Sequence, residues 1–321
     1  MTQSTDFTPP SRLSSTGPPA PPERYSEAMF RSLGPVAIDG GLGTLLESHG
    51  LDLTGGLWSA RVLDEHPDQI RAAHESFFHA GARIAITASY QVSYDGLARA
   101  GFGADDTDAL LRLSVELAME ARDLARPDGL VAASIGPYGA MLADGSEYRG
   151  DYGLSIARLR DWHRRRVGVL AESGADLLAF ETIPCLAEAE ALVSVVDGTG
   201  VPAWLSVTAS SGRLRSGEPL DEVFALTRGV AEIVAVGINC SHPAEVEAAI
   251  AAATASTDLP VVVYPNSGEE WDSKNHTWIG EPGFPSELVQ TWVDAGATLV
   301  GGCCRIGPAQ IREIAAQLAA R

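Results

Sequence analysis

The chain alternates short, continuously apolar runs with longer amphipathic segments. The apolar runs predict eight β-strands, at residues 36–39, 83–88, 130–135, 177–181, 203–208, 233–239, 261–264 and 298–301. Strands that are apolar at nearly every position are typical of a parallel sheet covered on both faces. We therefore expect these strands to be buried and to run in the same direction.

Eight segments with helical periodicity lie between and after these runs. They predict helices at residues 67–80, 107–125, 155–173, 187–196, 220–230, 243–253, 286–294 and 308–320. The strict alternation of strand and helix across residues 26–321 predicts an α/β fold, a closed (β/α)8 barrel of the TIM type in a single domain. An open doubly wound sheet is the alternative, because sequence does not show whether a sheet closes.

Residues 1–25 differ from the rest of the chain. They are rich in Pro, Ser and Thr and contain few large apolar residues. Such a segment buries too little apolar surface to offset the entropy of ordering it. We expect a disordered N-terminal tail there, followed by the barrel.

Composition and charge narrow the class of protein. The 321 residues include 23 Lys+Arg and 42 Asp+Glu, a formal net charge of −19. This surplus of acid argues against a nucleic-acid or anionic-membrane partner, since both require a basic surface. No apolar run is long enough to span a bilayer and no signal peptide opens the chain. The sequence therefore predicts a cytoplasmic protein, in which the four cysteines do not form a disulfide framework.

In a TIM-type barrel the site lies where the strands end. Polar or sulfur-bearing residues at or just after the predicted strand ends are Asp39, Gln91, Glu181, Thr208, Asn239, Cys240, Asn266, Cys303 and Cys304. The sixth and eighth strands flank the seventh, so Cys240 is expected to approach Cys303 and Cys304 at one rim.

Three convergent thiols suit a zinc ion. Soft thiolates favour zinc among the common cellular metals, and three protein ligands leave one tetrahedral position open. Two adjacent cysteines reach one ion only at an irregular strand end, and we expect Gly301-Gly302 to supply that conformational freedom. The alternative is that each thiol is a small buried hydrophobe. That interpretation is favoured for Cys185, which belongs to no paired motif.

Asp39 and Glu181 each end an apolar strand, where an unpaired charge is costly. They could form an acid/base pair, bind an ammonium group or cap the next helix. The seven histidines show no metal-ligand spacing. Only His242, just after Cys240, is a candidate neighbour of the site, and a nucleophilic Cys–His pair there would not explain Cys303-Cys304.

Four segments together resemble the homocysteine S-methyltransferase family: GINC at 237–240, GGCC at 301–304, DGGLGT at 39–44 and ETIP at 181–184. The resemblance extends from about residue 35 to residue 321, and the pairing of a lone cysteine with GGCC is its specific part. TASYQ at 87–91 and YPNSGE at 264–269 are closest to the branch that uses S-methylmethionine. A betaine-using enzyme remains open.

The resemblance implies an enzyme that binds Zn2+ through Cys240, Cys303 and Cys304. Gln91 or Tyr90 is a candidate for the fourth position before substrate arrives.

The resemblance also implies that Asp39 and Glu181 hold the amino group of L-homocysteine, while backbone amides near Gly40 and Gly41 bind its carboxylate. We expect Asn239 to belong to the same substrate site.

The implied reaction moves a methyl group from S-methylmethionine, or S-adenosylmethionine, to the zinc-bound thiolate of homocysteine and forms methionine. Charge is neutralised in this step, so exclusion of water favours it. Tyr264, Trp271 and Trp278 are candidates for an aromatic face against the sulfonium. The alternatives are a betaine-dependent methyltransferase, a non-catalytic zinc- or thiol-binding barrel and a redox enzyme using Cys303-Cys304. The expected partners are small molecules only.

Overall fold

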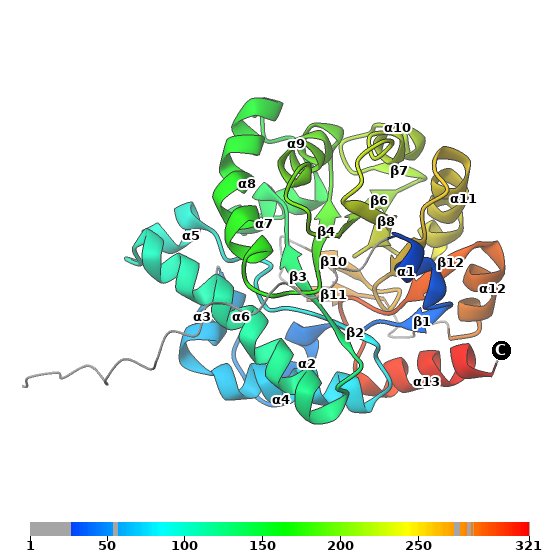
Figure 1. The fold of residues 1–321 in the computed structure, drawn as a ribbon, viewed down its shortest axis with the longest axis horizontal. Helices are drawn as coiled ribbons and strands as arrows, with labels where there is room; N and C mark the ends of the chain where they lie inside the picture. Colours follow the sequence, from blue (N-terminus) through cyan, green and yellow to red (C-terminus); the bar gives the residue numbers. More distant parts are fainter. Residues whose placement is uncertain (1–26, 54–56, 273–276, 281–283, 285, 321) are drawn as a thin grey trace, which may run out of the picture.

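The computed structural model describes residues 27–53, 57–272, 277–280, 284 and 286–320. The predicted tail at 1–25 lies outside these residues. Eight strands form one parallel sheet in the order β1-β12-β9-β8-β5-β4-β3-β2. A parallel bridge between Ile38 and Ile84 joins the first strand to the second. The strands thus close into a barrel, which confirms the predicted TIM-type fold (Figure 1).

The strands lie close to their predicted positions. Their bounds are β1 Val36–Ala37, β2 Ile84–Ile86, β3 Leu130–Ile135, β4 Leu177–Ile183, β5 Ala203–Val207, β8 Ile233–Asn239, β9 Val261–Tyr264 and β12 Ala297–Val300. All residues of β3, β4, β5, β8 and β9 are buried, as expected for strands covered on both faces.

The predicted helices cover the outside of the barrel. They are α4 Pro67–His79, α6 Ala104–Ala125, α8 Ile156–Ala171, α9 Leu186–Val196, α10 Leu220–Ala225, α11 Val246–Ser256, α12 Leu288–Ala295 and α13 Pro308–Ala319. Two predictions need correction. The helix expected at 220–230 ends at Ala225, and the one expected from residue 243 begins with a separate 3-10 turn, η2 Pro243–Glu245.

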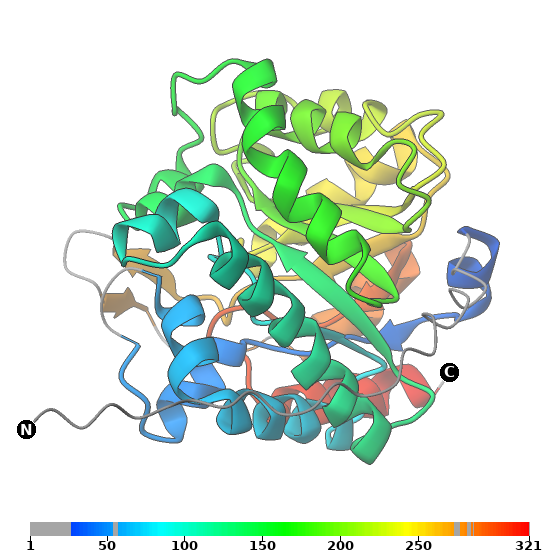
Figure 2. The same cartoon turned by 60° about the vertical axis from the view of Figure 1, so that its left-hand side comes forward.

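The strict alternation was wrong in the loops, where short elements are inserted. They are α1 Glu27–Ser32, α2 Leu42–Ser48, α3 Trp58–Glu65, α5 Tyr94–Arg99, α7 Tyr138–Leu142, η1 Ser146–Tyr148 and the hairpins β6–β7 (Ala209–Ser210, Arg213–Leu214) and β10–β11 (Glu270–Asp272, Thr277–Ile279). Elements this short leave little periodicity in a sequence. Figure 2 shows α1 at one end of the barrel and the β10–β11 hairpin at the other.

Side chains fill the inside of the barrel, so it is a packed core and not a pore. Phe30 of α1 packs with Ile38, Ile84 and Trp204 in this interior cluster. The Trp204 ring nitrogen donates a hydrogen bond to the Tyr264 hydroxyl over 3.1 Å. The apolar core therefore fills the half of the barrel nearer the amino ends of the strands. The polar groups lie at the carboxyl ends. Among the described residues, no helix has the length and apolarity needed to cross a membrane.

Candidate metal and substrate site

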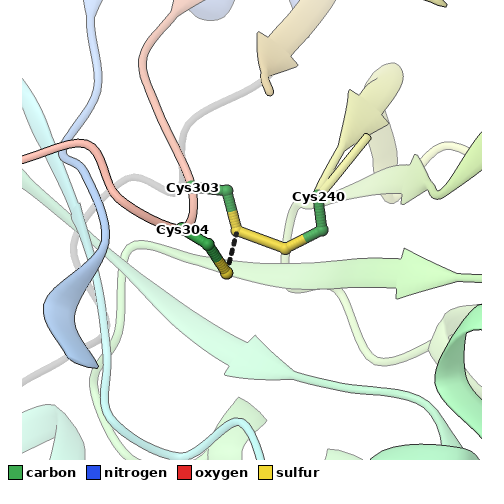
Figure 3. A group of neighbouring side chains, drawn as sticks. All are labelled: Cys240, Cys303 and Cys304. Carbon is green, nitrogen blue, oxygen red and sulfur yellow. Dashed lines mark hydrogen bonds between the residues drawn. A yellow bond between two sulfur atoms is a disulfide. The ribbon is translucent and has the colours of Figure 1, made fainter. Parts of the chain in front are cut away.

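Three cysteines meet at the carboxyl end of the barrel. Cys240 follows β8, and Cys303 and Cys304 follow β12, on either side of β9. Their Sγ atoms all lie within 4.8 Å of one another, and those of Cys303 and Cys304 are 3.9 Å apart (Figure 3). The strand order thus brings together sulfur atoms that are far apart in sequence.

Cys240 and Cys303 are joined by a disulfide. The expectation that the cysteines form no disulfide framework did not foresee this bond, which pairs two residues of the same site. Cys185 is buried and stands apart from the cluster. Burial raises the pKa of the Cys304 thiol to about 12. Three sulfurs within reach of one point fit a soft metal ion, which stabilises thiolates where burial opposes them.

The backbone at the site is bent by non-glycine residues. Six described residues other than glycine have a left-handed φ, and three of them are Thr182, Cys240 and Arg305, at 61°, 46° and 68°. Such conformations cost about 1–2 kcal/mol each and cluster at functional sites. The bend was expected at Gly301-Gly302, but neither has a positive φ. A Cβ at Gly301 or Gly302 would collide with neighbouring side chains, so these glycines permit close packing instead.

Neighbouring loops hold the cysteine backbone in place. The amide of Cys303 donates to the Pro265 carbonyl over 2.8 Å. The amide of Cys304 donates to Oδ1 of Asn266 over 3.2 Å. The amide of Cys240 donates to the Tyr264 carbonyl over 3.3 Å. The last residue of β9 therefore positions Cys240, and the segment after β9 positions Cys303 and Cys304.

Two buried carboxylates lie in the same end of the barrel. Oδ2 of Asp39 accepts a hydrogen bond from the Ile86 amide over 2.7 Å, while no described group hydrogen-bonds Oδ1. Asp39 does not cap α2, whose N-cap is Gly41 without a side-chain bond, so the capping alternative is wrong for it. Burial raises the pKa of Asp39, and the Glu181 charge raises it further.

Glu181 lacks a cationic partner within the described residues. It accepts a hydrogen bond from the Ser134 hydroxyl. Burial raises its pKa to about 7, and the Ser134 and Tyr264 hydroxyls offset only part of that shift. Two acids that are costly to ionise together fit a ligand that brings a positive charge.

Gly40 and Gly41 precede α2 and pack against the segment that contains Cys303. A Cβ on Gly41 would lie 2.5 Å from the Cys303 carbonyl oxygen, and one on Gly40 would lie 2.5 Å from that of Ile306. The Gly41 amide donates to Ile306 over 2.8 Å. The two glycine motifs of the chain are therefore in direct contact.

Asn239 and Gln91, two other predicted site residues, form hydrogen bonds to groups of the protein itself. Oδ1 of Asn239 accepts from the Thr182 amide and the Ser206 hydroxyl, over 2.7 and 2.8 Å. Its amide nitrogen donates to the Thr182 hydroxyl, so Asn239 holds Thr182 in its left-handed conformation. Gln91 bonds to the backbones of Ser59 and Ala140. Both ends of the Gln91 amide are therefore engaged by the backbones of α3 and α7.

The remaining candidates separate clearly. His242 is exposed, and its Nδ1 accepts the Ala244 amide as the cap of η2. Tyr90 interacts electrostatically with Glu181 and stays near the cluster. Trp271 and Trp278 pair across the β10–β11 hairpin, but their side chains lie outside the described part of the structure.

Sequence reasoning missed three residues beside the cysteines. Tyr148 of η1 interacts electrostatically with Cys304. Glu147 precedes it, and the Arg215 guanidinium carbon lies 5.5 Å from the centroid of the Tyr148 ring. All three stand in loop insertions, and no strand-end position marks them. A cluster of turn residues at 143–146 was the local signal for Glu147 and Tyr148 only.

Comparison with known proteins agrees with this geometry. The homocysteine S-methyltransferase family model matches residues 36–318. Homocysteine S-methyltransferase 4 of Zea mays is 44% identical over an alignment of 303 positions, and the match covers 88% of this chain and 89% of the relative. Selenocysteine Se-methyltransferase of Brassica oleracea var. italica is 43% identical over an alignment of 318 positions, and the match covers 92% of each chain.

A solved structure gives the same result. The homocysteine methyltransferase MmuM from Escherichia coli, in its metallated form, superimposes with a TM-score of 0.81 at 42% identity, over 90% of this chain and 98% of that one. Its description as metallated agrees with a cysteine cluster suited to a metal. The chain belongs to the homocysteine S-methyltransferase family, and it is a methyltransferase that acts on homocysteine.

Proposed function

We propose that this enzyme transfers a methyl group from S-methylmethionine, or S-adenosylmethionine, to the thiolate of L-homocysteine bound at Zn2+. The observation that carries the proposal is the meeting of three cysteine sulfurs with two buried carboxylates at one end of the barrel. The sulfurs suit zinc, and the carboxylates suit an amino group. Together they match an amino acid that carries a thiol.

Cys240, Cys303 and Cys304 would hold the ion, with the Cys240–Cys303 disulfide reduced. When bound, zinc lowers the pKa of the homocysteine thiol so that it is a thiolate at neutral pH. Tyr90 is the candidate for the fourth position before substrate arrives, because Gln91 is engaged elsewhere.

The chain's own residues would orient the acceptor. Asp39 and Glu181 would bind the ammonium group of homocysteine, and its charge would favour their ionised forms. Of the two amides expected to bind its carboxylate, that of Gly40 would do so, because the Gly41 amide already donates to the Ile306 carbonyl. Asn239 would act through the backbone of Thr182, next to Glu181.

The reaction is a single displacement. The homocysteine sulfur forms a bond to the methyl carbon while the bond from that carbon to the sulfonium sulfur breaks. The leaving sulfur keeps the electron pair and becomes a neutral thioether, so opposite charges disappear together. A site closed to water favours such a step.

Metal removal and cysteine substitution test the proposal. Reduced protein should contain one zinc per chain and lose activity after chelation. Cys303→Ala or Cys240→Ala should lower kcat/KM by more than about 100-fold, which is the upper end of the loss for a group that only supports a metal ligand. Cys185→Ala is the matched control and should retain most of its activity. Equal losses in all three variants, or full activity without metal, would refute the assignment.

The methyl acceptor has a second candidate. Because one similar protein is a selenocysteine Se-methyltransferase, selenocysteine should be assayed beside homocysteine. Parallel assays with S-methylmethionine, S-adenosylmethionine and betaine identify the donor. Zinc bound without methionine formation from any donor would favour the non-catalytic barrel.

The domain organisation is part of the same proposal. We expect residues 26–321 to form the functional unit, with residues 1–25 as a dispensable tail. Removal of residues 1–25 should leave kcat/KM for homocysteine within about twofold.

A further inference from the structure

Three loops form a wall beside the cysteine cluster, and the acceptor site described above does not use it. The segment with η1 follows β3, Pro184 follows β4, and the β6–β7 hairpin follows β5. The amide and hydroxyl of Ser216 donate to the Pro184 carbonyl over 3.2 and 2.9 Å. A Cβ on Gly150 would lie 3.1 Å from the same carbonyl. The three loops therefore pack tightly around Pro184 and hold their side chains in place.

Arg215 brings a positive charge from this wall to the cysteines. Its Nε donates to the Thr208 hydroxyl over 3.2 Å, and that hydroxyl donates to the Cys240 carbonyl over 3.2 Å. Its guanidinium also lies over the Tyr148 ring. Two consecutive hydrogen bonds thus join Arg215 to the backbone of a cysteine of the metal cluster. A guanidinium in this place suits a carboxylate, which it can bind through two parallel N–H groups.

Glu147 brings a negative charge from the same wall. Its Oε2 is buried, and no described group hydrogen-bonds it. The carboxylate interacts electrostatically with Tyr90 and Cys304. Burial raises the pKa of Glu147, so a cationic ligand would stabilise its ionised form. Tyr148 interacts with both Glu147 and Arg215 and connects the two charges.

We infer that Arg215 and Glu147 bind the amino-acid end of the methyl donor, Arg215 its α-carboxylate and Glu147 its α-ammonium group. The inference rests on the proposed function, and it adds a second amino-acid subsite separate from Asp39 and Glu181. Tyr90 and Tyr148 offer aromatic faces to the sulfonium between them.

The subsite selects the chemical class of donor. A sulfonium α-amino acid, such as S-methylmethionine, carries both groups that the two residues recognise. Betaine has a carboxylate and no ammonium N–H, so it leaves Glu147 without a hydrogen-bonding partner. The geometry thus favours a donor with both a carboxylate and an amino group.

Matched donors test each half of the subsite. S-methylmethionine amide lacks the carboxylate, and 4-(dimethylsulfonio)butanoate lacks the amino group. In the zinc-loaded wild-type enzyme we expect each to have a KM about 10–100-fold above that of S-methylmethionine, the range for a lost charge-assisted contact. Arg215→Met should raise the KM for S-methylmethionine by the same factor. This variant should then have similar KM values for S-methylmethionine and for its amide. Glu147→Gln should lose the preference for S-methylmethionine over 4-(dimethylsulfonio)butanoate.

Controls separate binding from folding and from the acceptor site. Arg213→Met removes an exposed arginine from the same hairpin. It should change neither the KM for S-methylmethionine nor the KM for its amide. Arg215→Lys should restore part of the preference for the carboxylate. The KM for homocysteine should stay within about twofold in every one of these variants. Equal losses with S-methylmethionine and its amide, or a rise in the homocysteine KM instead, would overturn the inference.

Calorimetry distinguishes this inference from the proposed function. S-methylmethionine should bind the zinc-loaded protein more weakly after Arg215→Met and unchanged after Glu181→Gln. If S-methylmethionine binds in this Arg215-dependent way but no methyl group is transferred, the subsite is supported and the proposed reaction is refuted. Methyl transfer without selectivity at Arg215 would refute the subsite and leave the reaction standing.

Discussion

Two glutamates seven residues apart are both buried and have opposite surroundings. Glu181 in β4 is 7% exposed, and Glu188 in α9 is 0% exposed. Glu181 lies among hydroxyl groups, without a cation in the described structure. Glu188 accepts hydrogen bonds from the Tyr138 amide and the His163 ring, over 2.6 and 2.9 Å.

The Glu188 region contains its own positive charge. Arg166 is buried and donates to the Val92 and Gly136 carbonyls and to Nδ1 of His163. Since arginine only donates, His163 carries its proton on Nε2 and donates it to Glu188. Burial lowers the pKa of His163 to about 4, so the ring is neutral at physiological pH. Glu188 and Arg166 thus compensate each other within the fold.

The difference separates a structural acid from one that awaits a ligand. The Glu188 network ties α8 and α9 to the loops after β2 and β3. Those loops carry Tyr90 and Tyr148 to the site. At Glu181 the compensating charge is left to a substrate.

The largest expected effect comes from the structural acid. Glu188→Gln leaves Arg166 buried without its counter-charge, and breaking a buried pair in this way costs about 3–5 kcal/mol of unfolding free energy. Urea unfolding followed by circular dichroism measures it. Glu190→Gln, at an exposed position on the same helix, should change stability by less than about 0.5 kcal/mol. A loss below 1 kcal/mol for Glu188→Gln would contradict the structural interpretation.

The second largest effect is an increase in the free energy of unfolding when Glu181 is replaced. It has this sign because the Glu181 carboxyl is costly to ionise in the fold. Its pKa is raised from 4.5 to about 7 in the folded protein. Between these values the unfolded chain has already lost the proton that the folded chain keeps, so stability falls as pH rises toward 7. Glu181→Gln removes this penalty and should stabilise the ligand-free protein by at most about 3 kcal/mol at pH 8.

The gain from Glu181→Gln should nearly vanish at pH 4.5, where the carboxyl is protonated in the fold. Thermal unfolding of wild type and variant at the two pH values measures the difference. A variant that is less stable than wild type at pH 8 would show that Glu181 is already compensated.

The barrel was predictable because its signal is local. A run such as 233–239 is apolar at every position except Gly237 and Asn239, and it is buried as β8 with the predicted bounds. Strand order then placed Cys240 beside Cys303 with no further information. Asp39 and Glu181 were identified in the same way, since each is a charge at the end of an apolar strand.

The rest of the site depends on contacts between loops. Nothing local to Cys240 or Thr182 predicts a left-handed backbone, which is held by bonds to residues distant in sequence. Arg215 and Glu147 occur in a short hairpin and a 3-10 turn, where periodicity is absent. The 3-10 turn packs on α7 because Gly139 has no Cβ to meet the Glu147 amide, a contact visible only in three dimensions.

A third prediction concerns the acceptor and Glu181. If this carboxylate binds the ammonium group of homocysteine, Glu181→Gln should raise the homocysteine KM about 10–100-fold, as expected for loss of a charged hydrogen bond. Steady-state kinetics at saturating donor give the value. In the folded fraction of Glu188→Gln the homocysteine KM should stay within about threefold of wild type. An unchanged KM in Glu181→Gln would remove this residue from the acceptor site.

The smallest expected effect is a proton linked to homocysteine binding. In the folded protein without ligand the pKa of Glu181 is about 7. The carboxylate that binds the ammonium group is therefore the minor form at pH 6 and the major form at pH 8. Homocysteine affinity should therefore rise about tenfold more between pH 6 and pH 8 in wild type than in Glu181→Gln. The comparison is needed because release of the thiol proton adds the same slope to both proteins. The pKa of Asp39 is raised as well, so the two carboxyl groups share this proton before homocysteine binds and release it on binding. Calorimetry gives the slope of homocysteine affinity against pH in the two proteins. Equal slopes would place the proton on a different group, and the ionisation of Glu181 would then be as independent of homocysteine as that of Glu188.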